Sequence, residues 1–210
     1  KIMKKITILT IGLLFSISAV FADSTNVGFK ITNGELIASG TETTNLGAAS
    51  IVTQREREAD FSMASIFVER EVDIKGNFSM VIGLDLVPMT AEVAKLDGGT
   101  GFDATLEVGN LITAYIQPTF DLGDMSVFAK VGYSQADLDI TNISRQATNA
   151  GTASTDGNTG KDLEGMMFGA GIQKAVQHMG GDGFVRLEAT FTDFDEITHT
   201  NSNCKVVKAD

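Results

Sequence analysis

Residues 104–140 read ATLEVGNLITAYIQPTFDLGDMSVFAKVGYSQADLDI, and this stretch decides the fold. It contains two extended runs joined by a short polar link at residues 120–124. In the second run Val127, Ala129 and Val131 alternate with a different set of side chains that includes Lys130. A period of two indicates a β-strand, because successive side chains leave opposite faces of the pleat.

Both runs are longer than an ordinary globular strand and long enough to cross a bilayer when tilted, which takes about 9–11 residues. One face is aliphatic, and the other is small or polar with scattered charges. This pattern fits a strand with lipid on one side and a polar barrel interior on the other.

Five other segments alternate in the same way. In the second of them, where the faces are ambiguous, we expect Ser65, Phe67 and Glu69 to point inward. A further extended run starts at residue 205. We therefore predict an all-β fold, an antiparallel up-and-down transmembrane β-barrel with seven strands and the start of an eighth. The five segments are 26–37, 60–72, 77–88, 163–175 and 183–194.

The connections between these strands alternate in length. Short links should lie on one side and long polar loops on the other, which is how outer-membrane barrels arrange their periplasmic turns and extracellular loops. The short links are residues 73–76, 120–124 and 176–182, and the long ones are 38–59, 89–101, 140–162 and 195–203.

Residues 1–22 have the pattern of a secretory signal peptide. Lys4 and Lys5 precede an apolar run that is too short for a membrane helix, and small residues follow it up to Ala22. The sequence predicts cleavage after Ala22, which leaves residues 23–210 as one outer-membrane β-barrel domain.

The charge balance excludes nucleic acid as a partner. Without residues 1–22, which hold three lysines and no acidic residue, the chain keeps 13 basic and 27 acidic residues. Such an acidic chain repels phosphate backbones. Cys204 is the only cysteine, so no intrachain disulfide can form.

The chain resembles the small outer-membrane β-barrels of the OmpA, OmpX and opacity-protein type. The resemblance is clearest in VRLEATFTDF at residues 185–194, SVFAKVGY at 126–133 and MMFGAGI at 166–172. It implies eight strands, export to the bacterial outer membrane, and contact with its lipid and lipopolysaccharide. It also implies help from periplasmic chaperones and the barrel-assembly machinery, and a monomeric state.

Members of this family typically end in a strand whose last residue is aromatic. Here the chain ends in VVKAD at residues 206–210. The resemblance therefore implies an incomplete last strand, and we expect the ring to stay open beside it, with two unpaired edges.

No arrangement of residues predicts an enzyme or a cofactor. His178 and His199 fall at opposite ends of the predicted barrel, so they cannot share a catalytic site. We expect the acidic residues around His199 to face water rather than bind metal. The glycines of residues 98–101 lack the lysine and helix of a phosphate-binding loop.

Charged residues on the inward faces are the candidate site. Counted from the short turns, three bases and three acids fall at similar depths, and Glu107 lies nearer the outer mouth. We expect a mutually neutralising network that plugs the barrel, and the alternative is unpaired charges lining a water-filled pore. The network residues are Lys30, Glu69, Asp85, Glu107, Lys130, Arg186 and Glu188.

Three functions fit these observations. The first is a non-catalytic outer-membrane barrel with a structural or surface-interaction role. The second is a narrow porin-like channel for small solutes, although eight strands leave little more room than their own side chains fill. The third is a soluble lipocalin-like barrel, in which the aliphatic face would point inward.

The predicted topology can be tested with protease added to intact cells. Cleavage is expected within residues 140–162, because this loop should lie outside the cell, and residues 120–124 should be spared. Mass mapping of the fragments gives the cut sites. Cleavage at 120–124 with protection of 140–162 would reverse the topology.

Overall fold

The computed structural model describes residues 6–17, 25–46, 49–97, 102–145, 159–178, 181–195, 197–201 and 205–209, and its strands form a single sheet. Over this part of the chain, no helix has the length and hydropathy to cross a membrane.

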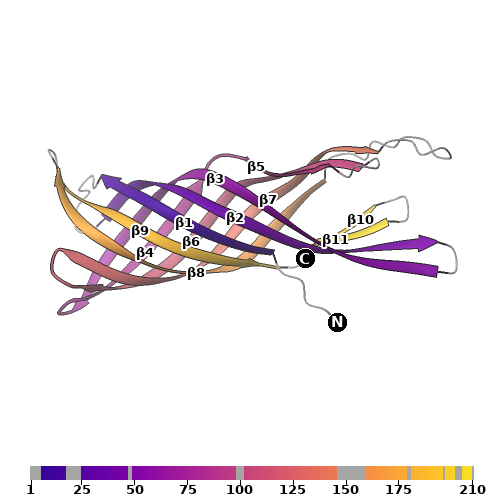
Figure 1. Ribbon diagram of the computed structural model, residues 1–210. Helices are drawn as coiled ribbons and strands as arrows, with labels where there is room; N and C mark the ends of the chain where they lie inside the picture. The colour runs from indigo at the N-terminus through magenta and orange to yellow at the C-terminus, as the bar shows by residue number, and fades with distance from the viewer. Residues whose placement is uncertain are drawn as a thin grey trace.

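Eight strands close into a ring, each antiparallel to both of its neighbours (Figure 1). The predicted fold class, an antiparallel up-and-down barrel, is therefore confirmed. Three short strands, β5 (Ala91–Asp97), β10 (Ile197–Asn201) and β11 (Lys205–Ala209), extend the wall at one end. The ring strands are β1 (Ile6–Ile17), β2 (Thr25–Leu46), β3 (Ala49–Lys75), β4 (Phe78–Val87), β6 (Phe102–Asp121), β7 (Met125–Arg145), β8 (Thr159–His178) and β9 (Gly181–Phe194).

The seven predicted strands are β2, β3, β4, β6, β7, β8 and β9, and their predicted faces are correct over most of their length. In β3, where the pattern was ambiguous, Ser65, Phe67 and Glu69 are buried inside the ring. Ile66 and Val68, between them, are exposed on the outer wall. The alternation follows from the pleat, with one face against the interior and the other against the surroundings.

Two segments share the eighth place of the ring. The predicted start of the eighth strand is β11, which pairs with β2 over Gly40–Thr44. Further along β2, β1 takes over from Ile37 and also pairs with β9. The open ring that we expected is therefore closed, because β1 fills the place. Cleavage after Ala22 stays a prediction of the sequence.

The long polar connections are largely strand, which corrects the expectation of loops. β2 and β3 continue as a hairpin to Leu46 and Ala49, so residues 38–46 and 49–59 are paired. β7 runs to Arg145 and β8 starts at Thr159, which shortens the link predicted at 140–162. The sequence of these segments lacks apolar alternation. A hairpin can nevertheless form through its backbone hydrogen bonds and carry polar residues on both faces.

The short links lie at the opposite end of the ring from these hairpins (Figure 1). The β3–β4 turn has Gly76 at φ 61°, and the β6–β7 turn has Gly123 at φ 96°. Both angles are in the left-handed region that glycine adopts without strain. The sequence placed both turns correctly.

A β-bulge in β6 shifts the register between Gly109 and Ile112. At its centre Asn110 has φ 50°, and its side-chain amide donates a 2.7 Å hydrogen bond to Asp137. Because a bulge adds a residue to one strand, the alternation reverses across it. Val108, predicted on the outer face, is buried in the interior.

Replacing Asn110 by valine should lower the free energy of unfolding by about 1–2 kcal/mol, because a β-branched residue is strained in the left-handed region. Urea unfolding of the refolded protein in detergent gives the value. Asn110→Gly is the matched control, since it loses the same hydrogen bond but tolerates the angle. Equal destabilisation by the two variants would mean that the backbone angle does not matter.

The charged interior as the candidate functional site

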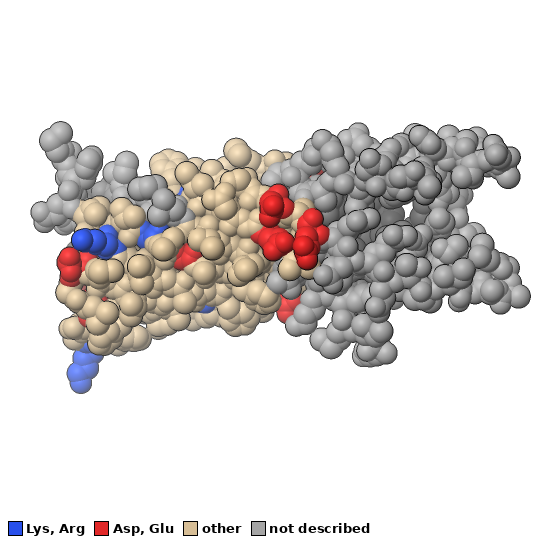
Figure 2. Space-filling model, viewed as in Figure 1, with Lys and Arg blue, Asp and Glu red and all other residues tan. Residues whose placement is uncertain are grey.

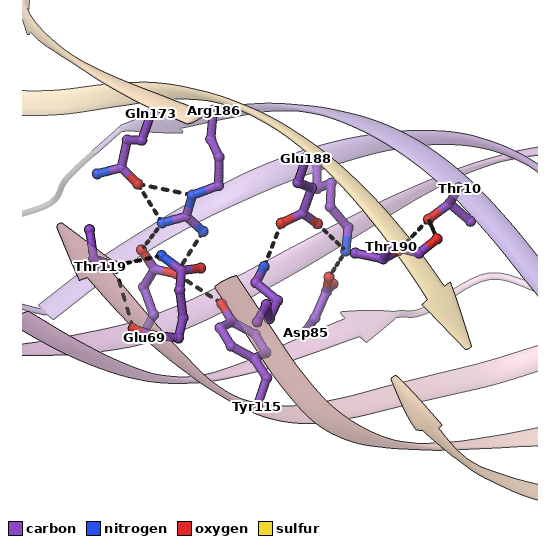
Figure 3. A network of polar contacts seen from close by, with 12 residues as sticks. Thr10, Glu69, Asp85, Tyr115, Thr119, Gln173, Arg186, Glu188 and Thr190 are labelled. Atoms are coloured by element: carbon purple, nitrogen blue, oxygen red, sulfur yellow. Dashed lines mark hydrogen bonds and ion pairs between the residues drawn. The ribbon is translucent and has the colours of Figure 1, made fainter. Parts of the chain in front are cut away.

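Six of the seven predicted interior charges point into the ring and lie close together (Figure 3). Five of them are buried, and the side chain of Lys30 is 15% exposed. Three are basic and three are acidic, so their formal charges cancel. They come from five different strands: Lys30 from β2, Glu69 from β3, Asp85 from β4, Lys130 from β7, and Arg186 and Glu188 from β9.

Arg186 and Glu69 form the first ion pair. Two guanidinium nitrogens donate to the two carboxylate oxygens of Glu69, at 2.7 and 3.0 Å. Arg186 also donates to Gln173 Oε1 from two nitrogens, at 2.6 and 2.9 Å. The Tyr115 hydroxyl donates a 2.9 Å bond to Glu69. Bidentate pairing of this kind is strong and fixes the planes of both groups.

Aromatic rings enclose the guanidinium of Arg186. Its central carbon lies 4.4 Å from the ring centre of Phe184, 5.1 Å from that of Phe128 and 5.8 Å from that of Phe67. Phe67 and Phe184 also stack on each other, with centroids 6.0 Å apart. Cation–π contacts gain strength when water is excluded, so the rings both shield Arg186 and attract its charge.

The second group of charges centres on Glu188. Lys130 donates to one of its oxygens at 2.5 Å, and Lys30 lies 3.5 Å from the other. Lys30 also pairs with Asp85, so it bridges two carboxylates. The Lys130 ammonium lies 4.3 Å from the centre of the Tyr115 ring, and Tyr115 therefore contacts both groups.

Interior glycines make room for these long side chains. A Cβ on Gly83 would collide with the ring of Tyr115, and one on Gly171 would collide with Phe128. Gly171 is also the cross-strand partner of Glu188. The interior of an eight-stranded barrel is only wide enough for side chains to fill. A large residue must therefore face a small one across the strand pair.

A few buried polar side-chain atoms inside the ring lack a hydrogen-bond partner. Within the described part of the chain, the buried atoms without a hydrogen-bond partner are Ser65 Oγ, Asp85 Oδ1 and Gln117 Oε1. Unpaired buried polar atoms cost about 1–3 kcal/mol each, so the network is held by its ion pairs against this penalty.

Glu107, the seventh predicted charge, lies beyond the β6 bulge when counted from the β6–β7 turn and is only partly buried. Its cross-strand partner is Asp139, and the interior position beside it belongs to Val108, opposite Leu138. The bulge at Asn110 reverses the alternation, so counting in twos from the β6–β7 turn puts Glu107 on the wrong face.

An apolar layer crosses the interior next to the charges, on the side of the long hairpins. Every ring strand contributes at least one buried side chain to it, so the layer spans the whole ring. Because the inward faces were predicted to be mainly small or polar, this layer was not predicted. Its members are Ile8, Leu36, Phe61, Met63, Val87, Val108, Ala136, Leu138, Leu163 and Phe194.

Sequence analysis also missed the neutral members of the charged group. Tyr115, Phe128 and Gln173 stand on faces that were correctly predicted as inward, but only charges were selected. The cross-strand register would have identified two of them, because Gln173 is opposite Arg186 and Phe128 is opposite Gly171.

The two histidines and the acidic residues were also considered as possible sites. The backbone of His178 lies at the turn end of β8, whereas that of His199 lies in β10 at the other end. Across the ranges that the structure describes, no three His, Cys, Asp or Glu side chains are grouped to hold a metal ion.

No family model and no curated protein matches this sequence. Two structures of Ail, the attachment invasion locus protein of Yersinia pestis, align with TM-scores of 0.35 and 0.34 and identities of 8% and 7%. One was solved in complex with the heparin analogue sucrose octasulfate. Each alignment covers 91% of this chain and 100% of that chain.

The secretin-domain β-barrel of InvG from the Salmonella SPI-1 injectisome aligns with a TM-score of 0.14 and 6% identity, over 100% of this chain and 63% of that chain. At such scores these likenesses say nothing about ligands or partners. The function has to come from the residues of this chain.

Replacing Arg186 by alanine should lower the free energy of unfolding by about 3–5 kcal/mol, because Glu69 is left charged and buried without its partner. Urea unfolding in detergent measures this loss. Lys174→Ala is the matched control, since Lys174 lies 3.7 Å from Asp124 in an exposed pair, 59% and 79% accessible. Such pairs are worth at most about 1 kcal/mol. Similar losses for both variants would show that burial adds nothing to the Arg186 pair.

Proposed function

We propose that this protein is a non-catalytic outer-membrane β-barrel with a closed interior, which serves the bacterial envelope as a structural element or through surface interactions. The observation that carries the proposal is the inversion of polarity across the wall. Charged and polar groups are buried inside the ring, and large apolar side chains are exposed outside it.

Exposed apolar side chains occur on every strand of the ring. On the face that Figure 2 shows, most of the described part of the wall is free of charged groups, and the Lys, Arg, Asp and Glu side chains that are visible gather mainly at the two ends of that part. A continuous apolar band of this kind is far larger than the patches that water-exposed monomers tolerate, and lipid is the solvent that fits it. One example from each strand, in ring order, is Ile11, Ile31, Val68, Leu84, Ile116, Val127, Phe168 and Leu187.

The apolar band argues against the soluble lipocalin-like alternative. That alternative needs the aliphatic faces to point inward around an apolar ligand. Instead, Ile31, Leu84 and Ile116 lie on the outer wall, while the corresponding inward faces carry Lys30, Asp85 and Tyr115.

Two interior layers favour a closed barrel rather than a channel. The charged layer is paired across the ring, and the apolar layer next to it receives side chains from all eight ring strands. An ion would have to break the pairs of the first layer and shed water to pass the second. The narrow channel therefore remains the second candidate.

The long hairpins are the part that would meet the outside of the cell. β2, β3, β7 and β8 extend well beyond the roughly ten residues that a bilayer requires. On this proposal residues 1–22 direct export, and contact with outer-membrane lipid and lipopolysaccharide follows from the apolar band. Assembly by periplasmic chaperones and the barrel-assembly machinery, as a monomer, belongs to the same proposal.

Purified barrel inserted into planar lipid bilayers should show no steady conductance, because both interior layers are closed. Single-channel recording at about 1 M salt gives the readout, where pairs exposed to water would be largely screened. A general porin serves as the positive control for insertion. Long-lived open channels from the unaltered protein would overturn the closed interior and favour the porin-like alternative.

A further inference from the structure

The outer wall of the ring carries an open groove of about 590 Å³, which crosses β3, β4, β6 and β7. Ala114 lines it with a short outward side chain, whereas the outward side chains next to Ala114 are large and 46–51% exposed. These neighbours are Ile112 and Ile116 along β6, Leu84 on β4 and Tyr133 on β7. Part of the groove is therefore the space that Ala114 leaves between them.

Arg70 lines the same groove where it begins on β3. It is exposed on the outer wall and interrupts a face of β3 that is otherwise apolar. The residues on either side of it are Ile66, Val68, Val72 and Ile74, which are 42–57% exposed. Within the described part of the chain, Arg70 takes part in no ion pair. A charged side chain on a lipid-facing wall is costly, and such a residue marks a functional site with a partner.

The groove offers Arg70 as its one charge on the outer face. The cross-strand partners of Arg70 are Thr25 on β2 and Ile82 on β4, and both line the groove with it. Glu69 also borders the groove, but its carboxylate faces the interior and is paired with Arg186. The outer face of the site therefore combines a positive charge at one end with an apolar surface along the rest.

We infer that this groove binds one phospholipid, with the phosphate on Arg70 and an acyl chain along Ala114. A guanidinium group matches phosphate in charge and geometry and can donate two parallel hydrogen bonds to it. The apolar remainder of the groove matches the hydrocarbon chain. The inference rests on the proposed membrane location and adds to it one lipid class, one site and the residues that hold the lipid.

The strand register gives the groove a direction. One cross-strand row runs through it, formed by Arg70, Ile82, Ile116 and Val131. Arg70 is six residues from Gly76 in the β3–β4 turn, and Val131 is eight residues from Gly123 in the β6–β7 turn. The row therefore leads away from the turn end, and a chain whose headgroup lies at Arg70 follows it into the wall. On the proposed topology the turns face the periplasm, so the lipid belongs to the periplasmic leaflet.

A simpler reading is that Arg70 only extends along the wall to the water at the turn end, as long basic side chains do. That reading makes Ala114 irrelevant, because the two residues stand two strands apart, on β3 and β6. Dependence of lipid binding on both positions is therefore the specific mark of the inferred site.

Native mass spectrometry of the 210-residue chain, refolded in detergent, tests the site. With phosphatidylglycerol added, one lipid per barrel should survive removal of the detergent. Diacylglycerol with the same acyl chains lacks the phosphate and should be retained several-fold less. Arg70→Gln should weaken phosphatidylglycerol binding about tenfold, the loss expected for one charge-assisted contact. Equal retention of the two lipids by the unaltered barrel would overturn the inference.

Filling the groove gives a second readout that touches no charge. Ala114→Leu should also lower phosphatidylglycerol retention several-fold. Two matched controls lie outside the groove: Lys174→Gln removes an exposed base, and Ala170→Leu makes the same enlargement at an exposed residue of β8. Both should retain lipid like the parent. A groove variant that behaves like its control would overturn the inference, and so would a dimer of barrels in place of bound lipid.

Failure of the site and failure of the proposed function can be told apart. All four variants should keep heat-modifiable migration on a gel, because the four positions are exposed and the interior is unchanged. A parent barrel that inserts into phospholipid vesicles but retains no lipid in the spectrometer would overturn the site alone. A chain that stays folded and monomeric in buffer without detergent would overturn both.

Discussion

Every charge inside this ring has to be neutralised inside the ring, because eight strands leave no room for a column of water around it. The bidentate pairing of Arg186 with Glu69 is the clearest result of that constraint. This ion pair determines which residues can stand around it. Glycine stands where a long side chain must cross, and aromatic rings close around the guanidinium. The second group, around Glu188, is balanced in the same way.

The wall therefore has a polar, tightly packed interior on one side and an apolar outer surface on the other. Each strand fits both sides, because its successive side chains point alternately inward and outward. The period explains how much of the fold could be predicted. In β2, β4 and β7 a single alternating pattern states which residues face inward, and those assignments are correct. The charged residues were found for the same reason, since the alternation identified the inward positions and the charged residues among them could be read from the sequence.

The features that could not be predicted depend on one extra residue within a strand or on contacts between side chains of different strands. Nothing local marks Asn110 as a bulge, yet that one residue reverses the alternation, so that Val108 rather than Glu107 is the buried residue of the two. The apolar layer went unnoticed because its members are spread over eight strands and meet only after the ring closes. The polar hairpins were predicted as loops because their sequences carry polar residues in both alternating sets and so show no apolar alternation. The hydrophobicity of Ile6–Ile17 suits a signal peptide and a wall strand equally.

The pairing of glycines with aromatic side chains across neighbouring strands bears on how the interior can change. Gly83 is the cross-strand partner of Tyr115, and Gly171 is that of Phe128. A larger residue on one strand of such a pair needs a smaller one on the other, because the interior of an eight-stranded barrel is only wide enough for its side chains. Interior substitutions are therefore expected in matched pairs on adjacent strands, whereas positions on the outer wall can vary one at a time.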